Sequence, residues 1–215
     1  MKPSHPLTSK LELFLNASHN GNIEKMRSLL AVGEFNINDR NKYGQTALIA
    51  AVLPNSSSVV NPEFKPDYEK KSEAEIVSWL LERGADPHIS ENNGYTAIHH
   101  AVKGGHLDAV RALVSFDPSL LSSEVKNWQP LHLAVAFNRY EIAEFLIMSG
   151  AVTQVKVNVE GREFSLSDLI SRTCSVGDRE RMTSLINSQQ SSFALRGDAV
   201  RPAAREGGDL NRGIA

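Results

Sequence analysis

Apolar residues recur at helical spacing in short paired segments along most of the chain, and these pairs follow one another at a fixed interval. The clearest pair lies in residues 92–118, and its pattern is repeated in residues 126–151, about 33 residues further on. The copies align at apolar and polar positions alike: Gly94 with Asn127, Ile98 with Leu131, His99 with His132, Ala101 with Ala134, and Leu113 with Leu146. A period of this length, holding a turn and two short helices, is typical of a stacked repeat array.

The pattern extends in both directions from this pair. A third copy of the turn and first helix starts at Gly44, and its second helix, from Glu73 to Arg83, follows an insertion of about 17 residues. The inserted segment, 54–71, holds three prolines and a serine cluster, which predicts a loop. The units at either end, 11–40 and 158–188, keep helical spacing but lack parts of the pattern, as expected of terminal caps.

Local signals mark where several of these elements begin and end. Ser72 and Glu75 have the spacing of a capping box at the start of the helix after the insertion. Gly33 is placed to end a helix in the left-handed conformation, and Gly44 to supply a positive φ at the base of a β-hairpin predicted for residues 35–43. Asn127 stands where the other copies have glycine, and asparagine tolerates the same left-handed backbone.

The repeated residues resemble those of the ankyrin repeat family, whose core pattern reads G-x-T-P-L-H-x-A. The chain has GYTAIHHA from Gly94 and NWQPLHLA from Asn127, and LLERGAD from Leu80 is similar to the family's repeat ending. The resemblance implies an all-α solenoid of about five repeats with imperfect terminal caps, each repeat joining a helix-turn-helix to a β-hairpin finger.

We expect one repeat domain over residues 11–188. Its repeats are predicted at 11–40, 41–90 with the inserted loop 54–71, 91–123, 124–157 and 158–188. Residues 1–10 are expected to be flexible. Residues 189–215 are polar, without an apolar stripe that could pack, and are expected to form a disordered tail.

Composition narrows the classes of partner. Among 215 residues 41% are hydrophobic, and the net charge of -2 gives no electrostatic reason to expect nucleic acid or an anionic membrane as partner. No apolar run is long enough to span a bilayer. The single cysteine, Cys174, allows no internal disulfide and suits a reducing compartment, so we expect a cytoplasmic, monomeric protein.

Candidate chemistry is weak throughout the sequence. His99 and His132 occupy the histidine position of the family pattern, where the resemblance implies that the imidazole bonds the backbone and threonine hydroxyls of neighbouring repeats. His99 and His100 would point about 100° apart on a helix and cannot easily share one ion. There is also no cysteine pair, no nucleophile elbow and no phosphate-binding loop, so we expect no metal, no cofactor and no enzymatic activity.

The resemblance implies a protein partner bound on the concave face of the array. The resemblance implies that the position after the turn glycine projects into that face, and this position holds Gln45, Tyr95 and Trp128 in successive repeats. Neighbouring variable positions complete the predicted partner-binding set with Tyr43, Asn92, Asn93, Lys103, Lys126 and Phe137. Aromatic residues with a polar rim are typical of binding hot spots. The alternative is that Trp128 folds onto Phe137 and only covers the stack.

Two other functions remain open from the sequence. The chain could be a regulatory or inhibitory subunit that blocks an enzyme through the inserted loop or the tail, and Phe64 and Tyr68 make the loop a possible second docking site. It could also be a secreted bacterial effector that acts in a host cytoplasm.

Overall fold

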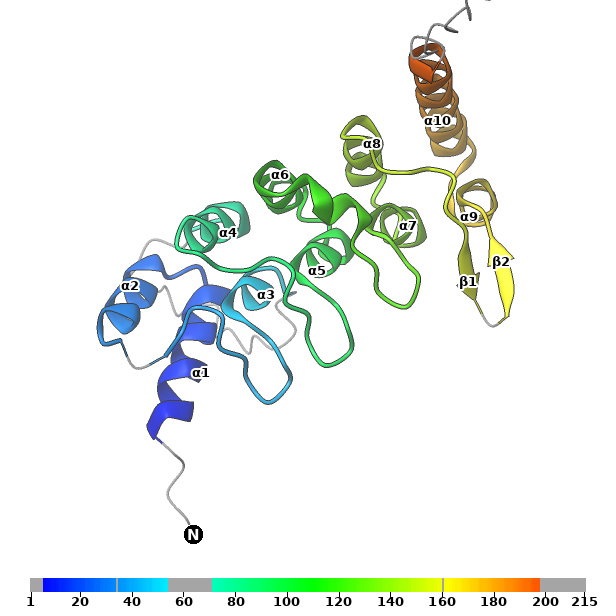
Figure 1. Ribbon diagram of the computed structural model, residues 1–215. Helices are drawn as coiled ribbons and strands as arrows, with labels where there is room; N and C mark the ends of the chain where they lie inside the picture. The colour runs from blue at the N-terminus through cyan, green and yellow to red at the C-terminus, as the bar shows by residue number, and fades with distance from the viewer. Residues whose placement is uncertain (1–5, 34, 54–70, 160, 198–215) are drawn as a thin grey trace, which may run out of the picture.

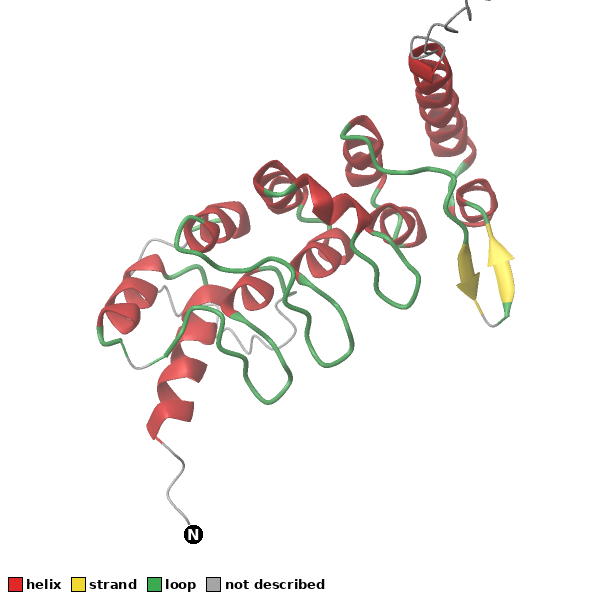
Figure 2. Cartoon of the chain, in the orientation of Figure 1, coloured by secondary structure: helices red, strands yellow, loops and turns green. Residues whose placement is uncertain are grey.

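The computed structural model describes residues 6–33, 35–53, 71–159 and 161–197, which form helix pairs stacked in one row (Figures 1 and 2). The pairs are α1 (Pro6–His19) with α2 (Ile23–Ala31), α3 (Ala47–Ala51) with α4 (Glu73–Leu81), α5 (Ala97–Gly104) with α6 (Leu107–Phe116), α7 (Pro130–Ala136) with α8 (Tyr140–Met148), and α9 (Leu166–Thr173) with α10 (Val176–Gly197). A 3₁₀ turn, η1 (Pro118–Ser122), follows α6. The all-α solenoid expected from the sequence is confirmed.

Two rows of buried residues hold the stack together, and each of three successive repeats contributes one residue to each row. Leu48, Ile98 and Leu131 lie at matching places on the inner helices α3, α5 and α7, and each is at most 1% exposed. The outer helices α4, α6 and α8 contribute a matching row, formed by Leu80, Leu113 and Leu146. All six belong to one continuous apolar cluster. The period in the sequence is therefore the period of the core.

Side-chain caps start several helices, and the sequence predicted one of them. The predicted capping box at α4 is confirmed: Glu75 N donates to Ser72 Oγ, and Ser72 N donates to Glu75 Oε2 at 2.9 Å. Ser165 and Asp168 form a second capping box at α9. At α3, Thr46 Oγ1 accepts from Ile49 N. These short helices thus satisfy backbone N–H groups that would otherwise lack a partner.

Segments that project from one side of the row precede the inner helices, and we call them fingers: residues 35–45, 85–95, 123–128 and 157–164 (Figure 1). Left-handed residues stand in the turns of the first three fingers: Gly44 at φ 79°, Gly94 at φ 87° and Asn127 at φ 66°. The positive φ predicted for Gly44 and Asn127 is therefore confirmed, as is the left-handed Gly33 after α2, at φ 71°.

The prediction of a β-hairpin for residues 35–43 is wrong. Among the described residues, a two-stranded ladder forms only in the fourth finger, between β1 (Val157–Val159) and β2 (Arg162–Phe164). In the first finger, Asn41 Oδ1 accepts from the backbone N–H groups of Tyr43 and Gln45, and Asn36 Oδ1 accepts from Asn38 N. Asparagine side chains take hydrogen bonds that a strand partner would make, so the segment forms turns instead.

The helical region also extends beyond the expected boundaries. Helix α1 begins at Pro6, inside the segment expected to be flexible, and proline is well suited to the first turn of a helix. Helix α10 continues to Gly197, past the point at 189 where the disordered tail was expected to begin. Its last turns contain good helix formers in the sequence, such as Ala194 and Leu195. Residues 54–70 of the inserted loop 54–71, and residues 198–215, lie outside the described residues.

Candidate functional site

The nine residues predicted to bind a partner all lie on the fingers or at the ends of inner helices, a surface that we call the inner face. Tyr43 is 56% exposed in the first finger and Phe137, directly after α7, is 45% exposed. Lys103 lies half-buried in the last turn of α5. The other six lie in the first three fingers: Asn92, Asn93 and Lys126 are exposed, and Gln45, Tyr95 and Trp128 are half-buried. The structure brings only some of the nine into contact.

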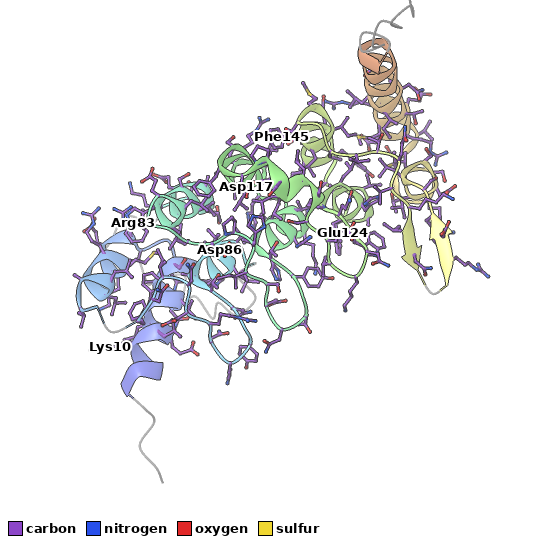
Figure 3. All side chains as sticks on the ribbon, viewed as in Figure 1. Lys10, Arg83, Asp86, Asp117, Glu124 and Phe145 are labelled. Atoms are coloured by element: carbon purple, nitrogen blue, oxygen red, sulfur yellow. The ribbon has the colours of Figure 1, made fainter. Side chains whose placement is uncertain are left out.

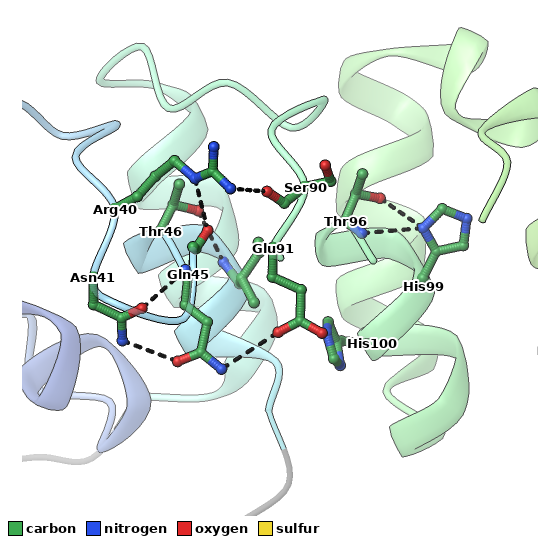
Figure 4. Close-up of polar contacts among 11 residues, drawn as sticks. Arg40, Asn41, Gln45, Thr46, Ser90, Glu91, Thr96, His99 and His100 are labelled. Carbon is green, nitrogen blue, oxygen red and sulfur yellow. Dashed lines mark hydrogen bonds and ion pairs between the residues drawn. The ribbon is translucent and has the colours of Figure 1, made fainter. Parts of the chain in front are cut away.

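A ladder of polar side chains joins the first finger to α5 (Figure 4). Asn41 Nδ2 donates to Gln45 Oε1 at 3.0 Å, and Gln45 Nε2 donates to Glu91 Oε2 at 3.4 Å. The other Glu91 oxygen lies 3.3 Å from His100 Nε2, at ion-pair distance. Both the oxygen and the nitrogen of the Gln45 amide form hydrogen bonds within the protein. Gln45 therefore helps to hold the inner face in place.

Glu91 and His100, the last two members of this ladder, are buried, and each is only 9% exposed. Burial lowers the pKa of His100, and the nearby Lys103 ammonium lowers it further, whereas the Glu91 carboxylate opposes both effects. A buried carboxylate is costly unless it is paired or hydrogen-bonded; the Gln45 amide donates a hydrogen bond to Glu91, and His100 Nε2 lies within ion-pair distance of it without forming a hydrogen bond of normal geometry. Residues from two repeats are thereby fixed relative to each other.

Lys103 brings two of the predicted aromatic residues together. Its ammonium lies 4.6 Å from the ring centroid of Tyr95 and 5.3 Å from that of Phe137. Tyr95 also packs at 5.4 Å from the His100 ring, next to the polar ladder. The attraction between a cation and two aromatic faces holds the Lys103 ammonium at a defined place beside the Tyr95 and Phe137 rings.

Trp128 stands apart from this cluster. It is half-buried against the core, and within the described part of the chain no ring contact joins it to Phe137, whose ring faces Lys103 instead. The alternative in which Trp128 folds onto Phe137 is therefore not what the structure shows.

The predicted structural role of His99 is confirmed. His99 Nδ1 accepts from Thr96 N at 3.2 Å and lies 2.9 Å from Thr96 Oγ1, while Nε2 lies 3.2 Å from Ser123 O in the next finger. Burial lowers the pKa of His99 to about 4, so the ring is neutral near pH 7. A neutral ring that accepts on one nitrogen and donates on the other ties two repeats together.

Comparison with known proteins agrees with this geometry. The family profile described as ankyrin repeats (3 copies) matches residues 68–158. The Notch-regulated ankyrin repeat-containing protein of Xenopus laevis is 32% identical over 115 residues, which cover 52% of this chain and 84% of that protein. The chain belongs to the ankyrin repeat family. The ankyrin histidine position accordingly explains His99 and His132, and ankyrin repeats are generally modules of protein–protein interaction.

Other ankyrin relatives are longer than the matched region. Ankyrin repeat domain-containing protein 63 of Homo sapiens is 32% identical over 138 residues, which cover 63% of this chain and 33% of that protein. Putative ankyrin repeat protein L92 of Acanthamoeba polyphaga mimivirus is 34% identical over 97 residues, 44% of this chain and 20% of the viral protein. The chain thus spans about a third or less of these two relatives.

His132 follows the ankyrin pattern at one ring nitrogen and departs from it at the other. Its Nε2 donates to Val155 O at 2.9 Å, as His99 does toward Ser123, but its buried Nδ1 has no partner among the described residues. Gln129 occupies the position that Thr96 fills in the preceding ankyrin repeat, and its amide donates to Glu124 Oε1 instead. Burial also lowers the pKa of His132.

Three members of the inner face were not expected from the sequence. Glu91 and His100 were not predicted to pair, and Arg139 was not singled out although its guanidinium donates twice to Lys103 O, at 2.9 and 3.1 Å. A signal existed for one of them: His100 is a polar residue directly beside a core position of an ankyrin helix. Within the described ranges no three potential ligands gather to hold a metal ion, and no helix there has the length and hydropathy of a membrane span.

Proposed function

We propose that this ankyrin repeat chain is a non-enzymatic, cytoplasmic binding module that holds a partner protein on its inner face. The observation that carries the proposal is the cluster of Tyr95, Lys103 and Phe137, which presents aromatic and cationic groups together on a framework fixed by the polar ladder. Preorganised aromatic anchors lose little conformational entropy on binding. Exposed Tyr43 and half-buried Trp128 extend the same surface along the fingers.

The stacked architecture supports the same proposal. Each repeat contributes one finger and one inner-helix end, so the fingers and inner helices of successive repeats follow one another along the row (Figure 1). The side chains that hold the stack, such as Ile98 between Leu48 and Leu131 in the inner row, are buried in the core. The exposed finger residues are therefore free to vary without loss of the stack.

The test uses peptides selected from a phage-displayed random library on the immobilised wild-type chain, with affinities then measured by fluorescence anisotropy. Changing Phe137→Ala or Trp128→Ala is expected to weaken binding by about 2 kcal/mol or more, the size of a hot-spot contact. Phe116→Ala is the matched control and should leave binding unchanged, because Phe116 is 54% exposed at the end of outer helix α6. Ligands that bind both inner-face variants as tightly as wild type would show that the inner face is not the site.

A further inference from the structure

The lysines of the inner face have no carboxylate partner among the described residues. Lys42 lies 5.0 Å from the ring centroid of Tyr43, Lys103 lies over Tyr95 and Phe137, and Lys126 is exposed in the third finger. No ion pair in the described part of the chain includes any of the three. Among the described residues, the contacts of the Lys42 and Lys103 ammonium groups are therefore with aromatic faces, and Lys126 is open to solvent.

The carboxylates of the same fingers are already engaged by the protein. Asp39 accepts from Asn36 N at 2.9 Å, Asp86 accepts from His88 N at 2.8 Å, and Glu124 accepts from Gln129 Nε2 at 3.2 Å. Glu91 is buried between Gln45 and His100. These acids are held in place by neighbours other than the three lysines.

Several cations of the outer helices, in contrast, have acidic partners. Arg27 pairs with Glu24 on α2, Arg83 pairs with Glu82 at the end of α4, and Arg181 of α10 pairs with Glu144 of α8. Figure 3 shows Arg83 on the outer side of the row and Glu124 on the finger side. Although the whole chain carries a net charge of -2, its inner face presents three lysines that form no ion pair with the described acids, and two of them, Lys42 and Lys103, lie over aromatic rings.

We propose that the inner face binds a protein segment rich in Asp and Glu, with aromatic or aliphatic residues between the acids. The Lys103 ammonium, held between two rings, is placed to meet a carboxylate, and the rings beside it offer apolar contact. This inference rests on the proposed function and adds the chemistry of the partner. A nucleic acid fits less well, because the three lysines are spread over separate repeats and the chain as a whole is slightly acidic.

The test begins by sequencing the peptides selected on the wild-type chain. The proposal expects enrichment of Asp and Glu over the unselected library, and weaker binding as salt rises from about 0.1 M to about 1 M, where the Debye length falls from about 10 Å to about 3 Å. Each of Lys42→Gln, Lys103→Gln and Lys126→Gln should weaken binding by about 1.5- to 5-fold. The losses of binding free energy should add in the triple variant, because the three sites are well separated.

Lys25→Gln is the matched control, because it removes one exposed positive charge from outer helix α2 and should leave affinity unchanged.

Selected peptides that are neutral or basic, or that bind the triple variant normally, would overturn the proposal of an acidic partner. If those peptides still bind the Phe137→Ala variant more weakly than wild type, the proposed binding function is supported and the acidic partner is not. Peptides insensitive to both sets of changes, or a failed selection, count against both proposals. Tighter binding of a single-stranded oligonucleotide than of any acidic peptide would also overturn the inference.

Discussion

At the scale of single residues, His99 and His132 show how one neighbour decides what a repeated side chain can do. Both rings reach a backbone carbonyl in the next finger, at Ser123 and Val155 respectively. Only His99 has a threonine beside it, and of these two histidines only His99 uses both ring nitrogens within the described structure. The family pattern predicts the first contact in both repeats, but the second depends on one substitution, Gln129 for threonine.

The His99 ring predicts a pH dependence of stability. Its pKa of about 4 in the folded chain lies below the ordinary value of 6.5, so the unfolded chain binds the proton more readily. Stability contributed by the neutral ring is complete above pH 6.5 and is lost as pH falls toward 4, by up to about 3 kcal/mol. Urea unfolding across this range should show His99→Gln less stable near pH 7 but with a shallower acid slope. Parallel slopes would assign the acid sensitivity to other groups, including His100 and His132.

At the scale of elements, the sequence predicts the helices better than their connections and ends. Helices α3 to α8 follow a repeating apolar pattern, and its residues are buried in one cluster. The first finger forms turns because asparagine side chains compete for the backbone, which composition alone does not reveal. Helix α1 begins before, and helix α10 ends after, the limits predicted from the apolar pattern, because that pattern marks core positions and not helix ends.

The C-terminal helix pair predicts unequal effects of two truncations. Leu166, Ile170 and Met182 are buried where α9 and α10 pack against α7 and α8. Ending the chain after Ala151 removes this cover and exposes apolar surface of the fourth repeat, so the melting temperature and solubility should fall markedly. Ending it after Ser188 keeps the buried residues of α10 and should change the melting temperature little. Similar losses in the two truncations, measured by circular dichroism, would contradict this.

At the scale of the whole molecule, the period predicts which residues share the inner face but not how they contact one another. Tyr95 and Trp128 are found from their place in the repeat. The ladder from Gln45 to Glu91 and His100 joins two consecutive repeats, and the first of them contains the insertion that breaks the regular spacing. The contact of Lys103 with Phe137 depends on side-chain direction at two helix ends, which a repeat pattern does not specify.

The linear stack also predicts that stability varies along the row. Helices α5 to α8 have a helix pair packed on both sides, whereas α1 and α2 at one end and α10 at the other have a neighbour on one side only. In such an array the end units open without unfolding the centre, because stability is a sum of each unit and its interfaces. Native-state hydrogen exchange should therefore show the slowest amides at buried central positions such as Val110 and Leu113, and faster exchange at Met26 and Ile186. Equal protection at all four positions would show instead that the stack unfolds as a single cooperative unit.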